Sequence, residues 1–162
     1  MINLSSLKKG DLVVRYGKAL KVLQVNKNTV ELQPYYNLQA SNNLTYTVQL
    51  QQTNQHYIRP LTTKKQITQL LKLIKTKSKQ SNSVNYADLD SNLKTNLLKE
   101  TLLAIKALWL EKRSQNGILS SGKLKLFRQA MLQASEEISI SNKILPEKAK
   151  LLILSNLKYT RA

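Results

Sequence analysis

Residues 44–71, LTYTVQLQQTNQHYIRPLTTKKQITQLL, change their apolar period halfway along, and this change decides the fold class. In TYTVQL every second residue is apolar, which predicts a half-buried strand. After Pro60 the apolar residues recur at helical spacing, and Thr62 or Thr63 can cap the helix that they predict. The apolar positions of this helix are Ile67, Leu70, Leu71 and Ile74. The stretch therefore marks the passage from strands to helices.

Short strands are predicted on both sides of this first apolar alternation. DLVVRYG predicts a strand that turns at Gly17, and KALKVLQV predicts the next one, although Val25 fits its alternation poorly. A turn over residues 26–28 leads into the strand TVELQP, and HYIRP forms a last short strand. Four or five short strands with tight turns are typical of a small SH3- or Tudor-like barrel.

Helical periodicity dominates the chain from Tyr86 onward. A single helix is predicted up to the QNG sequence, where Gly117 fits the left-handed position that ends a helix. Ser120 or Ser121 begins the next helix, and Pro146 suits the first turn of the last one. The stripe of the first helix comprises Leu98, Leu102, Ile105 and Trp109, widened by Leu97, Thr101, Ala104 and Leu108. The stripe of the second helix comprises Leu124, Phe127, Met131, Ala134 and Ile138.

The predicted organisation is an α+β chain in two parts. A β-barrel module with a closing helix spans residues 1–76, a polar linker spans 77–85, and an all-helical module spans 86–162. Trp109 and Phe127 lie on the apolar stripes, so we expect them inside the helical module, on either side of the Gly117 turn.

Positive charge is the dominant feature of the composition. The chain has 26 Lys and Arg against 9 Asp and Glu, a net charge of +17. A field of this size predicts polyanionic partners such as DNA or RNA. A lysine- and asparagine-rich composition bias is the alternative, but such a bias does not by itself remove acidic residues. No apolar run is long enough to cross a membrane, and no export-signal pattern opens the sequence. We therefore expect a cytoplasmic protein with no membrane partner.

The residues that enzymes need are sparse. The chain has no cysteine, a single histidine (His56), and four glycines that form no phosphate-binding loop. Asp88 and Asp90 are expected to stabilise a helix N-terminus, and Glu136 and Glu137 to face solvent. Metal-dependent nucleases need several convergent acids. We therefore predict a binding protein that is not an enzyme, with no metal, no cofactor and no small-molecule substrate.

A basic tip is predicted where two helices meet around Gly117. Lys112 and Arg113 end the first helix, and the second begins with cations whose helix N-terminus adds anion-binding N–H groups. The latter cations are Lys123, Lys125 and Arg128. Alternatively, Lys112 and Arg113 only offset the dipole of their own helix. Tyr86, which opens the helical module without apolar neighbours, is the better candidate than Trp109 for an aromatic that inserts into a DNA groove.

The order of these pieces resembles a known family. LKKGDLVVRYG, followed by a strand that ends before RP and a threonine-capped helix, is similar to the polymerase-interacting module that CarD-type regulators share with transcription-repair coupling factors. LWLEKRSQNGILSSGKLKLFRQAMLQASEEI resembles the CarD helical segment. The matching positions there are Leu108, Trp109, Leu119, Ser120, Gly122, Leu126, Ala130, Glu137 and Ile138. The chain carries no ATPase motor, so it does not resemble a complete coupling factor.

The resemblance implies a function in transcription. The β module would bind the RNA polymerase β subunit, and the helical module would contact promoter DNA just upstream of the melted region. The polymerase-binding positions would be Thr45, Thr47, Gln49 and Arg59, with Thr47 standing where the family often has a basic residue. Tyr86 would take the place of the tryptophan that the family wedges into the minor groove. The implied protein is nucleoid-associated, and a monomer or a weak dimer.

Two other functions remain open at this point. Small basic barrels also bind RNA, so a ribosome-associated or general RNA-binding protein is the alternative. A nuclease or nucleotide-processing enzyme is disfavoured by the small number of acids.

Overall fold

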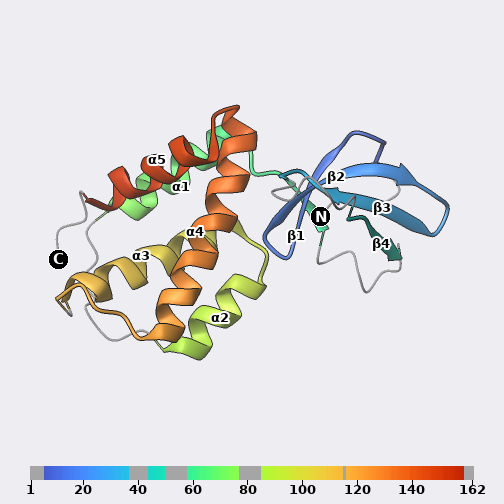
Figure 1. Cartoon of the computed structure of the whole chain (residues 1–162). Coiled ribbons are helices and arrows are strands. Elements are labelled where there is room, and N and C mark those ends of the chain that lie inside the picture. The colour runs from blue at the N-terminus through green and yellow to red at the C-terminus, as the bar shows by residue number, and fades with distance from the viewer. Residues whose placement is uncertain (1–5, 37–43, 50–57, 77–84, 115, 159–162) are drawn as a thin grey trace. The chain divides into compact units, whose positions relative to one another are not determined.

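The computed structural model of the protein describes residues 6–36, 44–49, 58–76, 85–114 and 116–158. The chain is α+β, with a curled antiparallel sheet followed by helices (Figure 1). It divides into two compact units, Met1–Leu61 and Thr62–Ala162, called here the β unit and the helical unit. Each has its own cluster of buried apolar side chains.

Five strands, counted among the described residues, make up the sheet of the β unit. They are β1 (Leu12–Arg15), β2 (Lys18–Val25), β3 (Thr29–Pro34), β4 (Tyr46–Gln49) and β5 (Ile58–Pro60). All pairs are antiparallel, and the strand order is β4-β3-β2-β1-β5. One face carries the core residues Val13, Leu20, Val22, Val30, Leu32, Val48 and Ile58, and Leu7, which precedes β1, belongs to the same cluster. The alternation predicted for β3 and β4 is thus confirmed, as is that of Leu20 and Val22 in β2.

Tight turns connect the first three strands. Tyr16 and Gly17 both have positive φ, at 50° and 73°, and form the two-residue turn between β1 and β2. Turns of this kind match the twist of a hairpin and favour glycine. The next turn is closed by Asn26, whose N–H donates to the carbonyl of Thr29 at 2.8 Å. Both predicted turns are confirmed.

A β-bulge explains why Val25 fitted the alternation of its strand poorly. The register between β2 and β3 shifts between Val22 and Gln24. An extra residue at a bulge reverses the face of the residues that follow it. Val25 therefore returns to the core side, where it packs half-buried against the main cluster. Leu50 and His56 lie outside the described residues.

Five helices, counted among the described residues, form the second unit. They are α1 (Lys64–Lys75), α2 (Tyr86–Lys94), α3 (Leu98–Ser114), α4 (Ser121–Asn142) and α5 (Pro146–Lys158). Thr63 caps α1 with a reciprocal bond to Gln66, and Ser120 caps α4. Pro146 occupies the first position of α5, as predicted. Helix α4 packs against both α3 and α5, and α2 packs against α3 and α4 (Figure 1).

Helix α1 was expected to close the β module, but its packing differs from that expectation. It contacts α3, α4 and α5, and Ile67, Leu71 and Ile74 are buried in the helical cluster. The buried Lys106 of α3 also donates to the carbonyl of Thr76, just after α1, at 2.8 Å. Burial lowers the pKa of Lys106. Sequence periodicity showed that α1 has an apolar face but not which elements cover it. The linker expected over residues 77–85 lies outside the described residues, except for Asn85.

The single long helix predicted from Tyr86 is two helices. Helix α2 ends at Lys94, and Asn96 adopts a left-handed conformation with φ of 61° before α3 begins. Asparagine tolerates this conformation better than most residues. The break leaves Leu97 49% exposed, although it was placed on the apolar stripe.

Trp109 and Phe127 both pack, half-buried, against the helical core, as predicted for an inward position. The deepest positions of α4 include Leu126 and Ala130, whereas Leu124 is only half-buried. The prediction that Glu137 faces solvent is wrong. Its side chain is 3% exposed, and Oε1 accepts from the N–H and hydroxyl of Thr62 at 2.9 and 2.6 Å. This carboxylate anchors the segment that enters α1.

Candidate nucleic-acid interface

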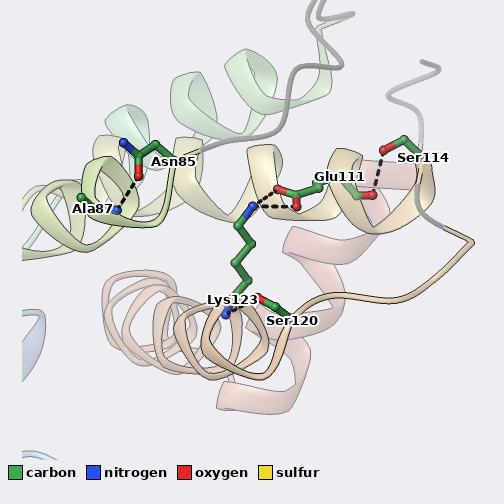
Figure 2. Close-up of polar contacts among 6 residues, drawn as sticks. All are labelled: Asn85, Ala87, Glu111, Ser114, Ser120 and Lys123. Atoms are coloured by element: carbon green, nitrogen blue, oxygen red, sulfur yellow. Dashed lines mark hydrogen bonds and ion pairs between the residues drawn. The ribbon is translucent and has the colours of Figure 1, made fainter.

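Tyr86 stands at the first turn of α2 with its ring partly in solvent. Asn85 begins the helix because its side-chain oxygen accepts from the N–H of Ala87 at 3.1 Å (Figure 2). This cap fixes the backbone on which Tyr86 is carried. The side chain of Tyr86 is 47% exposed. An aromatic of this exposure has a free face that a base or a groove wall can contact.

The ring of Tyr86 rests on a glycine of α4. A Cβ atom added to Gly122 would lie 3.2 Å from Cε2 and 3.6 Å from Cδ2 of Tyr86. A contact at 3.2 Å is closer than real Cβ atoms usually approach, so the lack of a side chain at Gly122 makes room for the ring. The first turns of α2 and α4 therefore meet at this aromatic.

Lys123 does not belong to the basic tip. Its Nζ donates to both carboxylate oxygens of Glu111 at 2.7 and 2.9 Å, and the two side chains are 16% and 5% exposed. Figure 2 shows the lysine reaching from the first turn of α4 to the carboxylate on α3. Each charge alone opposes the dipole of its own helix, since the acid is near a C-terminus and the lysine near an N-terminus. The pair is therefore a structural link, and Lys123 is not available to a phosphate.

Lys125 is the cation best placed to act with Tyr86. It is exposed and follows Gly122 by three residues, so the two positions share a side of α4. Arg128 is also exposed but is turned about 120° from Gly122 around the helix axis. At the end of α3, Arg113 is exposed and Lys112 is half-buried. The predicted tip is thus divided, and Lys125 is its exposed cation that shares a side of α4 with Gly122.

Lys94, at the other end of α2, is already paired. Its Nζ lies 2.6 Å from Oδ2 of Asp90, one helical turn earlier. The hydrogen bond and charge of Asp90 raise the pKa of this exposed lysine. Asp88 lies in the first turn of α2, where its negative charge interacts favourably with the helix dipole, as predicted.

The residues predicted to bind polymerase fall on two strands of the β unit. Thr47 and Gln49 lie exposed on β4, and Thr45 is exposed just before it. Arg59 lies half-buried on β5, at the opposite end of the strand order. The three neutral residues therefore form one surface, called here the β4 surface, and strand pairing does not join Arg59 to it.

The structural roles of two residues at the site, Gly122 and Glu111, were not predicted from the sequence. Gly122 entered the sequence interpretation only as a motif position, and nothing in the local pattern indicates an aromatic resting on it. Glu111 carried a usable signal, because it follows Ala104 and Leu108 at seven and three residues and so lies on the apolar stripe of α3. A charged residue at such a position calls for a partner inside the molecule.

The described residues contain no group of three or more His, Asp or Glu side chains that could hold a metal ion. No helix in the described part of the chain is long and apolar enough to cross a membrane. Comparison with models of known protein families finds no match, and comparison with curated proteins finds none either.

The contact between Tyr86 and Gly122 can be tested in the free protein by a double-mutant cycle. In the Tyr86→Ala background, Gly122→Ala is expected to increase the free energy of unfolding by about 0.5 kcal/mol, because alanine is the better helix former. With Tyr86 present, the added methyl crowds the ring and turns this gain into a loss of about 0.5 kcal/mol, which gives a coupling of about 1 kcal/mol between the two positions. Equal effects of Gly122→Ala in both backgrounds, measured by urea unfolding, would show that the ring does not rest there.

Proposed function

We propose that this protein is a CarD-like transcription regulator. Its β unit binds the RNA polymerase β subunit, and its helical unit binds promoter DNA at the upstream edge of the melted region, which stabilises the open complex. The motif order of the sequence supports this assignment, as does the succession of a curled five-stranded sheet and a helical unit. We propose in addition that the sheet is a Tudor-like half-barrel.

The exposure and the packing of Tyr86 are the main support for this proposal. This residue is a large aromatic, 47% exposed at the start of a helix, and it is held against a second helix N-terminus by the space at Gly122. Side chains that wedge between base steps must project from the surface and must also be supported from behind. Lys125, on the same side of α4, supplies a cation for the adjacent phosphates. In this proposal Tyr86 is the wedge residue, in place of the tryptophan that CarD-type regulators use.

The β4 surface supports a protein partner for the β unit rather than DNA. Thr45, Thr47 and Gln49 carry no charge, whereas a surface that binds phosphates needs cations. Strand β4 is also the last of the described strands on its side of the sheet. Edge strands with polar, uncharged side chains are suited to receive a strand of another protein. We propose that the lobe of the polymerase β subunit docks here.

The proposed mechanism involves binding alone, and no covalent bond is made or broken. A ligand shifts a two-state equilibrium only through the difference between its affinities for the two states. Tethered to polymerase by the β unit, the helical unit is held near the upstream edge of the promoter bubble. Tyr86 binds there to a step that is unstacked only in the open complex. The open state is therefore bound better than the closed state.

Retention of the protein on core RNA polymerase tests the assignment. The tagged, folded protein is expected to retain core polymerase through the β subunit. The change Thr47→Glu/Gln49→Glu should weaken retention about tenfold, because it puts two negative charges on an uncharged surface where the resembling family often has a basic residue at the Thr47 position. The control is the change Lys64→Glu/Lys65→Glu, because both lysines are exposed on α1 of the helical unit. This change should leave retention of polymerase unchanged. If folded protein retains no polymerase and instead binds structured RNA without preferring forked DNA, the RNA-binding function replaces this one.

A further inference from the structure

A groove lies between α4 and α5 of the helical unit, apart from Tyr86. It has a volume of about 420 Å³, which falls in the range of about 300–1,000 Å³ typical of binding pockets. Its lining residues are Phe127, Arg128, Met131, Leu132, Ser135, Pro146, Glu147 and Lys150. None of these residues has a role in the proposed contact with the melted promoter, and Arg128, which the sequence analysis assigned to DNA, lines this groove instead.

On the α4 side of the groove the apolar lining residues are Phe127, Met131 and Leu132. Arg128 lies about one turn before Leu132, and Ser135 lies about one turn after it. Leu132 is 52% exposed, which leaves a large apolar side chain without cover. On α5, Leu151 is 65% exposed and follows the lining residue Glu147 by four residues, so it extends this face. An elongated apolar face bordered by two helices fits a third helix better than a compact ligand.

The charge around the groove indicates which kind of helix fits. Arg128 and Lys150 also line the groove, and Glu147 is the only acid among its lining residues. The helical unit has 19 Lys and Arg against 7 Asp and Glu, so its net charge is +12. A basic helix would be repelled by this field, whereas an acidic one would be attracted to it. A nucleic-acid backbone would gain from the cations but would have nothing to place on the exposed side chains of Leu132 and Leu151.

We propose that this groove binds an acidic amphipathic helix of a partner protein. Apolar side chains on one face of that helix cover the exposed Leu132 and the half-buried Phe127, and carboxylates beside them pair with Arg128 and Lys150. The helical unit then has two binding surfaces, one for DNA at Tyr86 and one for an acidic protein segment between α4 and α5. The second surface does not depend on the assignment of the first, since it uses different side chains.

A designed peptide tests the groove directly. The probe is a fluorescein-labelled amphipathic helix with leucine on one face and glutamate elsewhere, and its binding to the full-length protein is followed by anisotropy. Leu132→Ser is expected to weaken binding about tenfold, as for a central apolar contact. Lys150→Glu is expected to weaken it about fivefold through charge repulsion. Leu132 and Lys150 are both exposed, so these variants should fold normally.

Matched controls separate the groove from a general attraction to the basic surface. Leu97→Ser removes another half-exposed leucine, Lys148→Glu reverses another cation of α5, and Tyr86→Ala alters the DNA surface. All three should leave probe binding within about twofold of wild type. The proposal is overturned if Leu97→Ser weakens probe binding as much as Leu132→Ser does. It is also overturned if a probe with lysine in place of glutamate binds as tightly as the glutamate probe, or if the glutamate probe does not bind. Binding to anionic vesicles that is lost in Leu132→Ser, without binding of the probe, would assign the groove to membranes instead.

Discussion

Replacing Tyr86 by alanine is expected to weaken binding to forked promoter DNA about tenfold, because the contact of one aromatic with a base is worth about 1–3 kcal/mol. The ring is half-exposed and is not part of the buried cluster, so the helical unit should remain folded. Tyr86→Phe retains the ring and should keep most of the affinity. The measurement is fluorescence anisotropy with a labelled DNA fork and with the corresponding closed duplex.

The comparison of fork and duplex makes this prediction specific. A wedge acts at unstacked base steps, so Tyr86→Ala should reduce affinity for the fork much more than for the duplex. Lys125→Ala should reduce both affinities and lower the salt dependence, as expected of a phosphate contact. Tyr35→Ala, which removes a tyrosine of similar exposure from the β unit, is the matched control. If Tyr86→Ala and Tyr35→Ala have the same affinity for the fork, Tyr86 is not the wedge.

Replacing Lys123 by alanine is expected to destabilise the helical unit by about 3 kcal/mol. The change leaves the Glu111 carboxylate, which is 5% exposed, without its bidentate partner. A buried charge that loses its partner carries the cost of desolvation without the compensating attraction. Urea unfolding can be followed by the fluorescence of Trp109, the single tryptophan, which packs against the helical core.

Two variants distinguish this ion pair from an ordinary loss of positive charge. Lys125→Ala, two residues later on the same helix, removes an exposed cation and should change the free energy of unfolding by less than about 0.5 kcal/mol. The double change Glu111→Leu/Lys123→Met replaces the pair by apolar side chains of similar size and should recover most of the lost stability. Equal stability of Lys123→Ala and Lys125→Ala would contradict the structural role of the pair.

Local features of the fold were predictable where one residue type decides the backbone. Gly17 and Gly117 were placed correctly because a positive φ favours glycine, and Pro146 because its ring suits the first turn of a helix. The break at Asn96 was missed because apolar residues continue at helical spacing on both sides of it. The bulge in β2 was visible only as the poor fit of Val25, since an inserted residue reverses the faces without changing the residue types.

The candidate site was only partly predictable, because it depends on residues that are distant in sequence. Exposure of Tyr86 followed from its lack of apolar neighbours, but its contact with Gly122 joins two helices across 36 positions. Lys123 was assigned to DNA from its charge and its place near a helix N-terminus, and neither feature reveals that a buried acid on α3 already holds it. Net charge predicts the class of partner, whereas the availability of each cation is decided by packing.

The lifetime of the open complex is the direct test of whether this protein stabilises it through Tyr86. Polymerase is assembled on a promoter, free polymerase is trapped with heparin, and decay of the complex is followed with and without the protein. Wild-type protein is expected to slow this decay in a saturable way, whereas Tyr86→Ala is expected to stay bound to polymerase but to slow the decay far less. If the lifetime is unchanged while wild-type protein is bound to polymerase, the protein does not stabilise the open complex.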